Sequence, residues 1–218
     1  MAFIDNLGFE LGVLVLIPAI AFYMGLFVWW YRRKGDVVRA YANLRGGAIT
    51  LGILGLFLSL LGFWGEFAWP LPGQYNVLFY DPTLFGGLIL VTFAIVVHLR
   101  LPTQYLGVIA GITGLGVAYY GARGYQLGLT KEPLEMFLLF LGFGLTAAAA
   151  FPVTLFADRY VIEPATRAPS GNSPSPAPPF PRIWNLPILL FLVLAALTGI
   201  ATILMGFNTL WSHLQYAP

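Results

Sequence analysis

Six long apolar stretches, separated by short polar connections, dominate the pattern of hydrophobic and polar positions along this chain. A membrane-spanning helix needs about 20 predominantly apolar residues. Backbone groups in lipid must be paired within their own segment, so continuous runs of this length predict helices rather than barrel strands. The pattern therefore predicts an all-α, polytopic integral membrane protein with six transmembrane helices, at residues 9–31, 46–67, 82–99, 102–121, 133–156 and 186–211.

The charged residues between the spans are distributed unevenly over the two faces of the membrane. One face would carry two basic and six acidic residues, and the other nine basic and three acidic residues. Lys and Arg are retained on the cytoplasmic side of short loops. We therefore expect a cell-membrane protein with both termini outside and with these basic residues inside: Arg32, Arg33, Lys34, Arg39, Arg45, Arg100, Arg159, Arg167 and Arg182.

Composition excludes several classes of function. Hydrophobic residues make up 59% of the chain and charged residues only 9%, against about 25% charged in a typical soluble domain. The net charge of +2 comes from basic residues at helix ends, so nucleic-acid binding has no support. The absence of cysteine excludes disulfides, thiolate nucleophiles, iron–sulfur clusters held by this chain and Cys-attached haem.

The chain divides into three predicted parts. Residues 1–156 form a five-helix membrane bundle, and residues 186–218 form the sixth transmembrane helix with an outer C-terminal tail. Between them, residues 157–185 are a cytoplasmic linker with seven prolines among Ser, Ala and Gly. That composition favours extended, polyproline-like conformations. We interpret it as a spacer rather than a docking ligand, which would let the last helix pack at some distance.

The outer connection between the second and third spans is unusually aromatic. Asp81 and Pro82 have the order of an N-cap followed by the first helical residue, so we expect the third helix to begin there. The preceding residues 68–81 would then lie on the membrane surface or against a partner. Four aromatic residues of this connection are candidates for such an interface: Trp69, Tyr75, Phe79 and Tyr80.

Small residues in the fourth span indicate close helix packing. Gly107 and Gly111 are spaced as in a GxxxG motif, which permits two helix backbones to approach closely. The contact could form within this chain or against another subunit, so both glycines are further interface candidates.

The two histidines are candidate cofactor ligands. His98 lies at the inner end of the third span and His213 beyond the outer end of the sixth. They would be separated by a membrane thickness of about 30 Å, so we do not expect this chain alone to hold a haem between them. A single histidine could bind a haem or chlorophyll-type pigment shared with a partner. The alternative is an interfacial histidine bonded to headgroups or backbone.

Glu66 is the third candidate for cofactor binding. It lies beside two aromatic residues in the segment 65–70, at the outer end of the second span. A carboxylate near a hydrophobic pocket could accept a proton from a quinol or bind a cation. The alternative is a solvated carboxylate at a helix end, or one paired with Arg123 or Lys131.

Polar residues within the spans are mostly Thr and Ser, whose hydroxyl groups can bond to their own helix. Proton relays and ion sites usually need a titratable group near mid-membrane, so an active transporter is disfavoured. The sequence also has no phosphate-binding glycine loop, HExxH pair or GxSxG elbow. We therefore predict no catalytic residue and no metal site.

Two stretches carry a resemblance to a known family. They are GEFAWPLPGQYNVLFYDP at residues 65–82 and GLTKEP at residues 128–133. With them, residues 1–160 resemble a family of uncharacterised archaeal and bacterial multi-pass membrane proteins, known only as a domain of unknown function. The resemblance implies a polytopic prokaryotic membrane protein and no activity. We expect the linker and the sixth span to be this chain's own variation.

The function that these features favour is a non-catalytic integral membrane subunit of a larger energy-converting complex, respiratory or photosynthetic. Its partners would be the lipid bilayer and other membrane subunits, and its cofactor, still unknown, could be a quinone, haem or chlorophyll-type pigment shared with them. One alternative is a small-molecule transporter or channel with a neutral pathway. Another is a quinol- or metal-binding oxidoreductase subunit that uses the outer carboxylates.

Overall fold

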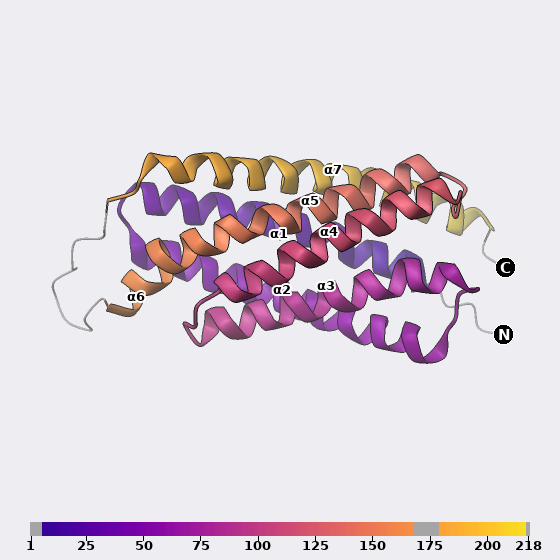
Figure 1. Ribbon diagram of the computed structural model, residues 1–218, viewed down its shortest axis with the longest axis horizontal. Coiled ribbons are helices and arrows are strands. Elements are labelled where there is room, and N and C mark those ends of the chain that lie inside the picture. The colour runs from indigo at the N-terminus through magenta and orange to yellow at the C-terminus, as the bar shows by residue number, and fades with distance from the viewer. Residues whose placement is uncertain (1–5, 168–178, 217–218) are drawn as a thin grey trace.

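Six long helices run side by side along the molecule (Figure 1). The computed structural model describes residues 6–167 and 179–216. Each of the six long helices is long and apolar enough to cross a membrane, which confirms the predicted all-α, six-span architecture. Their bounds are α1 Asn6–Arg33, α2 Val37–Ala68, α3 Gln74–His98, α4 Gln104–Gln126, α5 Pro133–Ala157 and α7 Asn185–Tyr216.

The long helices form a closed ring. Each one packs against its neighbours in the order α1, α2, α3, α4, α5, α7 and back to α1. The last helix therefore lies directly against the first and the fifth, and not at a distance from them. Residues 168–178, the central part of the predicted linker, lie outside the described residues. The division into three parts stays a prediction.

The two ends of the ring differ. The start of α1 and the end of α7 lie at the same end as the α2–α3 and α4–α5 connections, and we call this the terminal end (Figure 1). The α1–α2 and α3–α4 connections lie at the opposite, linker end, together with α6 (Glu163–Arg167). The basic residues expected inside belong to the linker end. Which end faces the cytoplasm stays a prediction.

Hydrogen bonds from a π-helical turn, Asp158–Ile162, fix the linker end. The Asp158 carboxylate accepts the backbone N–H groups of Thr103 and Gln104, at 2.7 and 2.8 Å. It thereby satisfies the free donors at the start of α4. The buried Arg32 donates its Nε–H to the carbonyl oxygen of Tyr160 at 2.7 Å. These bonds join α1, α4 and the end of α5.

Close packing of α4 against α5 depends on glycine. A Cβ atom added to Gly114 would lie 2.5 Å from the carbonyl oxygen of Gly144, and one added to Gly107 would lie 2.0 Å from Thr154 Oγ1. Side chains at these positions would force the two backbones apart. The small-residue contact predicted around Gly107 therefore forms within this chain.

The start of α3 differs from the sequence-based expectation. The helix begins at Gln74 and contains Pro82, so the prediction that Asp81 caps its first turn is wrong. The reason is a tertiary contact. Asn76 is fully buried, accepts the N–H of Leu71 at 3.3 Å and donates to the carbonyl oxygen of Gly65 at 3.0 Å. This amide stabilises the turn from α2 and lets α3 start two turns early.

Candidate functional site

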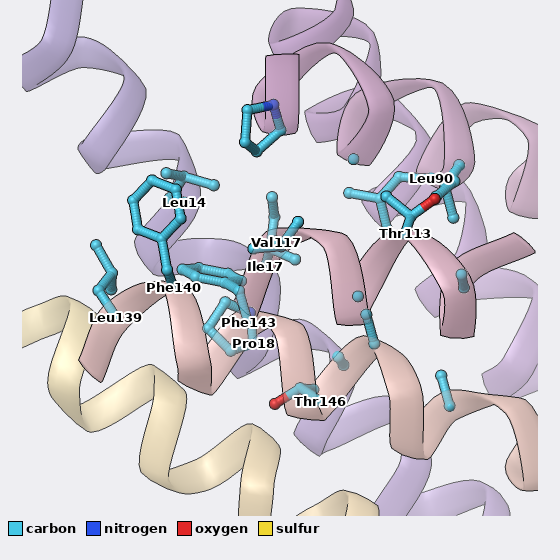
Figure 2. A pocket seen from close by; sticks show the side chains of 18 of the residues that line it. Leu14, Ile17, Pro18, Leu90, Thr113, Val117, Leu139, Phe140, Phe143 and Thr146 are labelled. Atoms are coloured by element: carbon cyan, nitrogen blue, oxygen red, sulfur yellow. The ribbon is translucent and has the colours of Figure 1, made fainter. Parts of the chain in front are cut away.

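A cavity of about 1040 Å³ lies inside the helix ring. All six long helices contribute residues to its lining, and most of these residues are apolar. Figure 2 shows side chains gathered around this space, with residues of α1, α3, α4 and α5 labelled. They include Leu14, Ile17 and Pro18 of α1, Leu90 of α3, Thr113 and Val117 of α4, and Leu139, Phe140, Phe143 and Thr146 of α5.

One face of α1 follows the cavity for most of the helix. Its lining residues recur at intervals of three and four, which places them on a single face. From the first of these, Glu10, to the last, Val28, the helix rises by about 27 Å at 1.5 Å per residue. The cavity is therefore elongated along the helix axes. The repeat consists of Glu10, Leu14, Ile17, Ala21, Met24 and Val28, and Leu11, Pro18 and Gly25 beside it also line the cavity.

The cavity is apolar toward the linker end and polar toward the terminal end. At the linker end its lining merges with the largest cluster of buried hydrophobic residues, through Leu44, Phe156 and Phe191. At the terminal end the lining includes side chains that carry charge or hydrogen-bonding groups. These are Glu10, Tyr75, Thr83, Thr130, Lys131, Glu132, Glu135 and Asn208.

Glu10 is the most deeply buried acidic group of this polar end. Its side chain is only 3% exposed. The hydroxyl group of Thr83 contacts Oε1 of Glu10 and also lies 2.8 Å from the carbonyl oxygen of Phe79. Oε2 of Glu10 is buried and has no hydrogen-bond partner among the described residues. A buried polar atom without a partner carries a desolvation cost of about 1–3 kcal/mol, so this oxygen is poised to accept a bond from a bound molecule.

Tyr80 lies on the same side of the ring as this carboxyl group. It is fully buried, its ring packs edge-on against Trp64 at 6.1 Å, and it interacts electrostatically with Glu10. Within the described part of the chain its hydroxyl group has no hydrogen-bond partner. Among the described residues, the terminal end of the ring thus contains four buried side-chain oxygens without a hydrogen-bond partner: Glu10 Oε2, Glu66 Oε1, Tyr80 Oη and Thr130 Oγ1.

A second polar group joins α2, α3 and α4 beside the cavity. The Tyr120 hydroxyl donates to Oδ2 of Asp81 at 2.7 Å, and the carboxyl groups of Glu66 and Asp81 interact with each other. Glu66 is half-buried and does not line the cavity. Its interacting neighbour is Asp81, and the ion pairs of the described residues do not include one between Glu66 and Arg123 or Lys131. A role in quinol or metal binding stays a prediction.

The structure does not bring the two candidate histidines into a site. His98 is exposed at the linker end, where its Nδ1 lies 3.1 Å from Nη2 of Arg45. His213 belongs to α7, but its side chain is outside the described residues. Over residues 6–167 and 179–208, no group of three or more His, Asp or Glu side chains gathers to hold a metal. Cofactor binding by either histidine stays a prediction.

The interface candidates of the outer connection separate into two kinds. Trp69 caps α2 with a left-handed backbone conformation, φ 47°, and is half-exposed. Tyr75 and Phe79 line the cavity, and Tyr80 is fully buried. Three of these four aromatic residues therefore face the interior of the bundle. Among the small residues, Gly111 lies beside α5, where an added Cβ would be 3.7 Å from Phe151.

Comparison with known families identifies the family of this chain but assigns no activity to it. The sequence matches the family described as "Protein of unknown function (DUF981)" over residues 1–216. The chain belongs to this family. No curated protein and no solved structure matches it significantly. Because the DUF981 match includes the linker and α7, the expectation that these are this chain's own variation is wrong.

Sequence reasoning missed the position of Glu10 in this DUF981 protein. It grouped Glu10 with the other acidic residues of the terminal end, as one of several surface carboxylates. The available signal was spacing, because Glu10 occupies the first place of a three-and-four repeat whose other members are apolar. A carboxylate in such a register faces the bundle interior.

Proposed function

We propose that this protein binds a lipophilic molecule inside its ring of six helices. The observation that carries the proposal is the elongated apolar cavity, to which every long helix contributes. Its volume of about 1040 Å³ is slightly above the roughly 300–1,000 Å³ typical of small-molecule sites. Such sites are mostly apolar with a few placed polar groups, and this lining has the same character.

The character of the lining favours a lipophilic occupant over water. Water is a poor filler, because buried water needs two to four polar partners and most of the lining offers none. A molecule with an apolar body fits the lining best.

The three functions considered from sequence remain proposals, and each predicts a different occupant. A subunit of an energy-converting complex would hold a pigment or quinone shared with partners, and a quinol-binding oxidoreductase subunit would hold its substrate. A transporter with a neutral pathway would hold its solute only briefly. An absorption spectrum and identification of chains that co-purify in mild detergent distinguish these cases. If the purified protein is colourless and no other chain co-purifies with it, the proposal of a pigment-binding subunit in a larger complex is wrong.

The binding proposal is tested by filling the cavity. Gly86 of α3 lines the cavity, and Gly116 of α4 does not. A Cβ atom added at either position meets no atom within 4 Å. Both substitutions to phenylalanine should therefore be accommodated, and only Gly86→Phe should occupy cavity space. Native mass spectrometry of protein released from lipid nanodiscs should show a retained lipophilic molecule in the wild type and in Gly116→Phe, with strong loss in Gly86→Phe. Equal retention in all three proteins would contradict the proposal.

A further inference from the structure

We infer that the molecule bound in the cavity is an elongated lipid with a neutral hydroxyl head group, which donates a hydrogen bond to Glu10. This inference rests on the proposed function and specifies its ligand. It follows from three features of the described residues: a carboxyl oxygen without a partner at the polar end of the cavity, no buried cationic side chain among the residues that line this end, and the length of the apolar body.

The first feature is the arrangement at Glu10. The carboxyl group lines the cavity, is 3% exposed, and has one oxygen in contact with Thr83. The other oxygen is buried without a partner in the described part of the chain. Thr83 thus contacts Oε1 of the Glu10 carboxyl group, and a hydrogen-bond donor in the cavity can bind Oε2. A hydroxyl group supplies one such donor.

The second feature concerns charge. The basic side chain that lines the polar end, Lys131, is exposed, so it does not lie in the buried environment of Glu10. A cationic head group would have to lose its hydration to form a buried ion pair, and the desolvation cost can exceed the Coulombic gain. A carboxylate head group would place a second acid against the first. A neutral hydroxyl group avoids both costs and still satisfies the free oxygen.

The third feature is length. The stripe of lining residues on α1, from Glu10 to Val28, rises by about 27 Å. The hydrocarbon core of a bilayer is about 30 Å thick, so a lipid chain in one leaflet spans roughly 15 Å. The cavity accommodates a chain longer than that of an ordinary leaflet lipid. An isoprenoid alcohol has the required combination of long apolar chain and single hydroxyl group.

The test compares probes that differ only in the head group. Geranylgeraniol, the hydrocarbon with the same skeleton, the corresponding amine and the corresponding acid are titrated into the full-length protein in nanodiscs. Wild type should bind the alcohol roughly three- to tenfold more tightly than the hydrocarbon, the range expected for one buried hydrogen bond. It should also prefer the alcohol to the amine and the acid.

Variants assign this preference to Glu10. Glu10→Leu should bind alcohol and hydrocarbon equally, and its retained hydrocarbon binding shows that the cavity is intact. Glu10→Gln, which keeps a carbonyl acceptor, should retain most of the preference for the alcohol. Gly86→Phe should weaken binding of both probes, which reports on the cavity itself.

Failure of the inference and failure of the proposed function give different results. If wild type binds alcohol and hydrocarbon equally while Gly86→Phe weakens both, the cavity binds lipids but Glu10 does not select the head group. Tighter binding of the amine or the acid would likewise overturn the hydroxyl assignment. If no probe binds, the inferred ligand class is wrong, and retention of a molecule in native mass spectrometry then decides the proposed function separately. If Gly86→Phe binds all of the probes as wild type does, the proposed function itself is wrong. The wild-type comparison needs no variant, so the inference is testable even if Glu10→Leu fails to fold.

Discussion

Thr83 of α3 contacts the buried carboxyl group of Glu10 on α1, although the two residues are 73 positions apart in the sequence. The two helices are not adjacent in the ring, so this contact crosses its interior at the polar end of the cavity. The contact connects two helices across the ring. It also holds the carboxyl group of Glu10 in place, with its second oxygen left without a partner among the described residues.

Thr83→Val should lower the free energy of unfolding by about 1–3 kcal/mol, because it leaves a further oxygen of Glu10 buried without a partner. The matched control is Thr92→Val in the same helix. Thr92 is exposed, and its hydroxyl group donates to the carbonyl oxygen of Leu88 in its own helix at 2.7 Å, so its replacement should change stability little. Unfolding in mixed detergent micelles measures both. Adding Glu10→Leu should abolish most of the cost of Thr83→Val, since the two residues are coupled. Independent, additive effects would contradict the contact.

Asp158→Ala should destabilise the protein by about 2 kcal/mol, since it removes a cap that satisfies two backbone donors of α4. Asp36→Ala offers a comparison. Asp36 caps α2 through one exposed bond to the N–H of Arg39, at 2.9 Å, so its loss should cost about 1 kcal/mol or less. Thermal unfolding in detergent ranks the two variants. A larger effect at Asp36 would show that the π-helical turn does not fix α4.

Gly114→Ala should destabilise the bundle by about 1–3 kcal/mol, because the added methyl group would lie 2.5 Å from a backbone oxygen of α5. Gly116→Ala, two residues away, adds a methyl group with no atom within 4 Å. It should be neutral or stabilise by about 0.5–1 kcal/mol through helix propensity. The same thermal assay reports both. Equal responses would mean that α4 and α5 are not in close contact.

The predicted orientation can be tested cleanly because the chain has no cysteine. Leu127 and Leu101 are both about half-exposed. Leu127 follows the last residue of α4 at the terminal end, and Leu101 follows the last turn of α3 at the linker end. The charge distribution predicts that Leu127→Cys, at the terminal end, reacts with a membrane-impermeant maleimide in intact cells. Leu101→Cys, at the linker end, should react only after the cells are permeabilised. The reverse pattern would place both termini inside.

Hydropathy alone predicts the six spans, because length and continuous apolar character are local properties that lipid enforces on each segment. The start of α3 could not be predicted in this way. Asn76 and Asp81 are polar residues typical of a connection or a cap. They lie in a helix here because Asn76 bridges to Gly65 and Leu71, and Asp81 accepts a bond from Tyr120. These bonds depend on helices that meet only in the folded ring.

The size and lining of the cavity could not be predicted from the sequence either, because they depend on which helices are neighbours. Lining and lipid-facing positions are both apolar, as Ile17 and Ile112 illustrate, so composition does not distinguish them. Glu10 was the exception. A carboxylate within an apolar three-and-four repeat marks an inward face, and that repeat can be read directly from residues 10–28.

The most direct test of the central claim is to find where a lipophilic molecule contacts the protein. Geranylgeraniol that carries a photoreactive diazirine on its chain is added to the protein in nanodiscs, irradiated, and the modified residues are identified by peptide mass spectrometry. We predict modification of residues that line the cavity, such as Leu14, Ile17, Val117 and Phe143, and suppression of that modification by unlabelled geranylgeraniol. Modification confined to outward-facing residues such as Ile112, Leu115 and Leu190 would contradict ligand binding inside the ring.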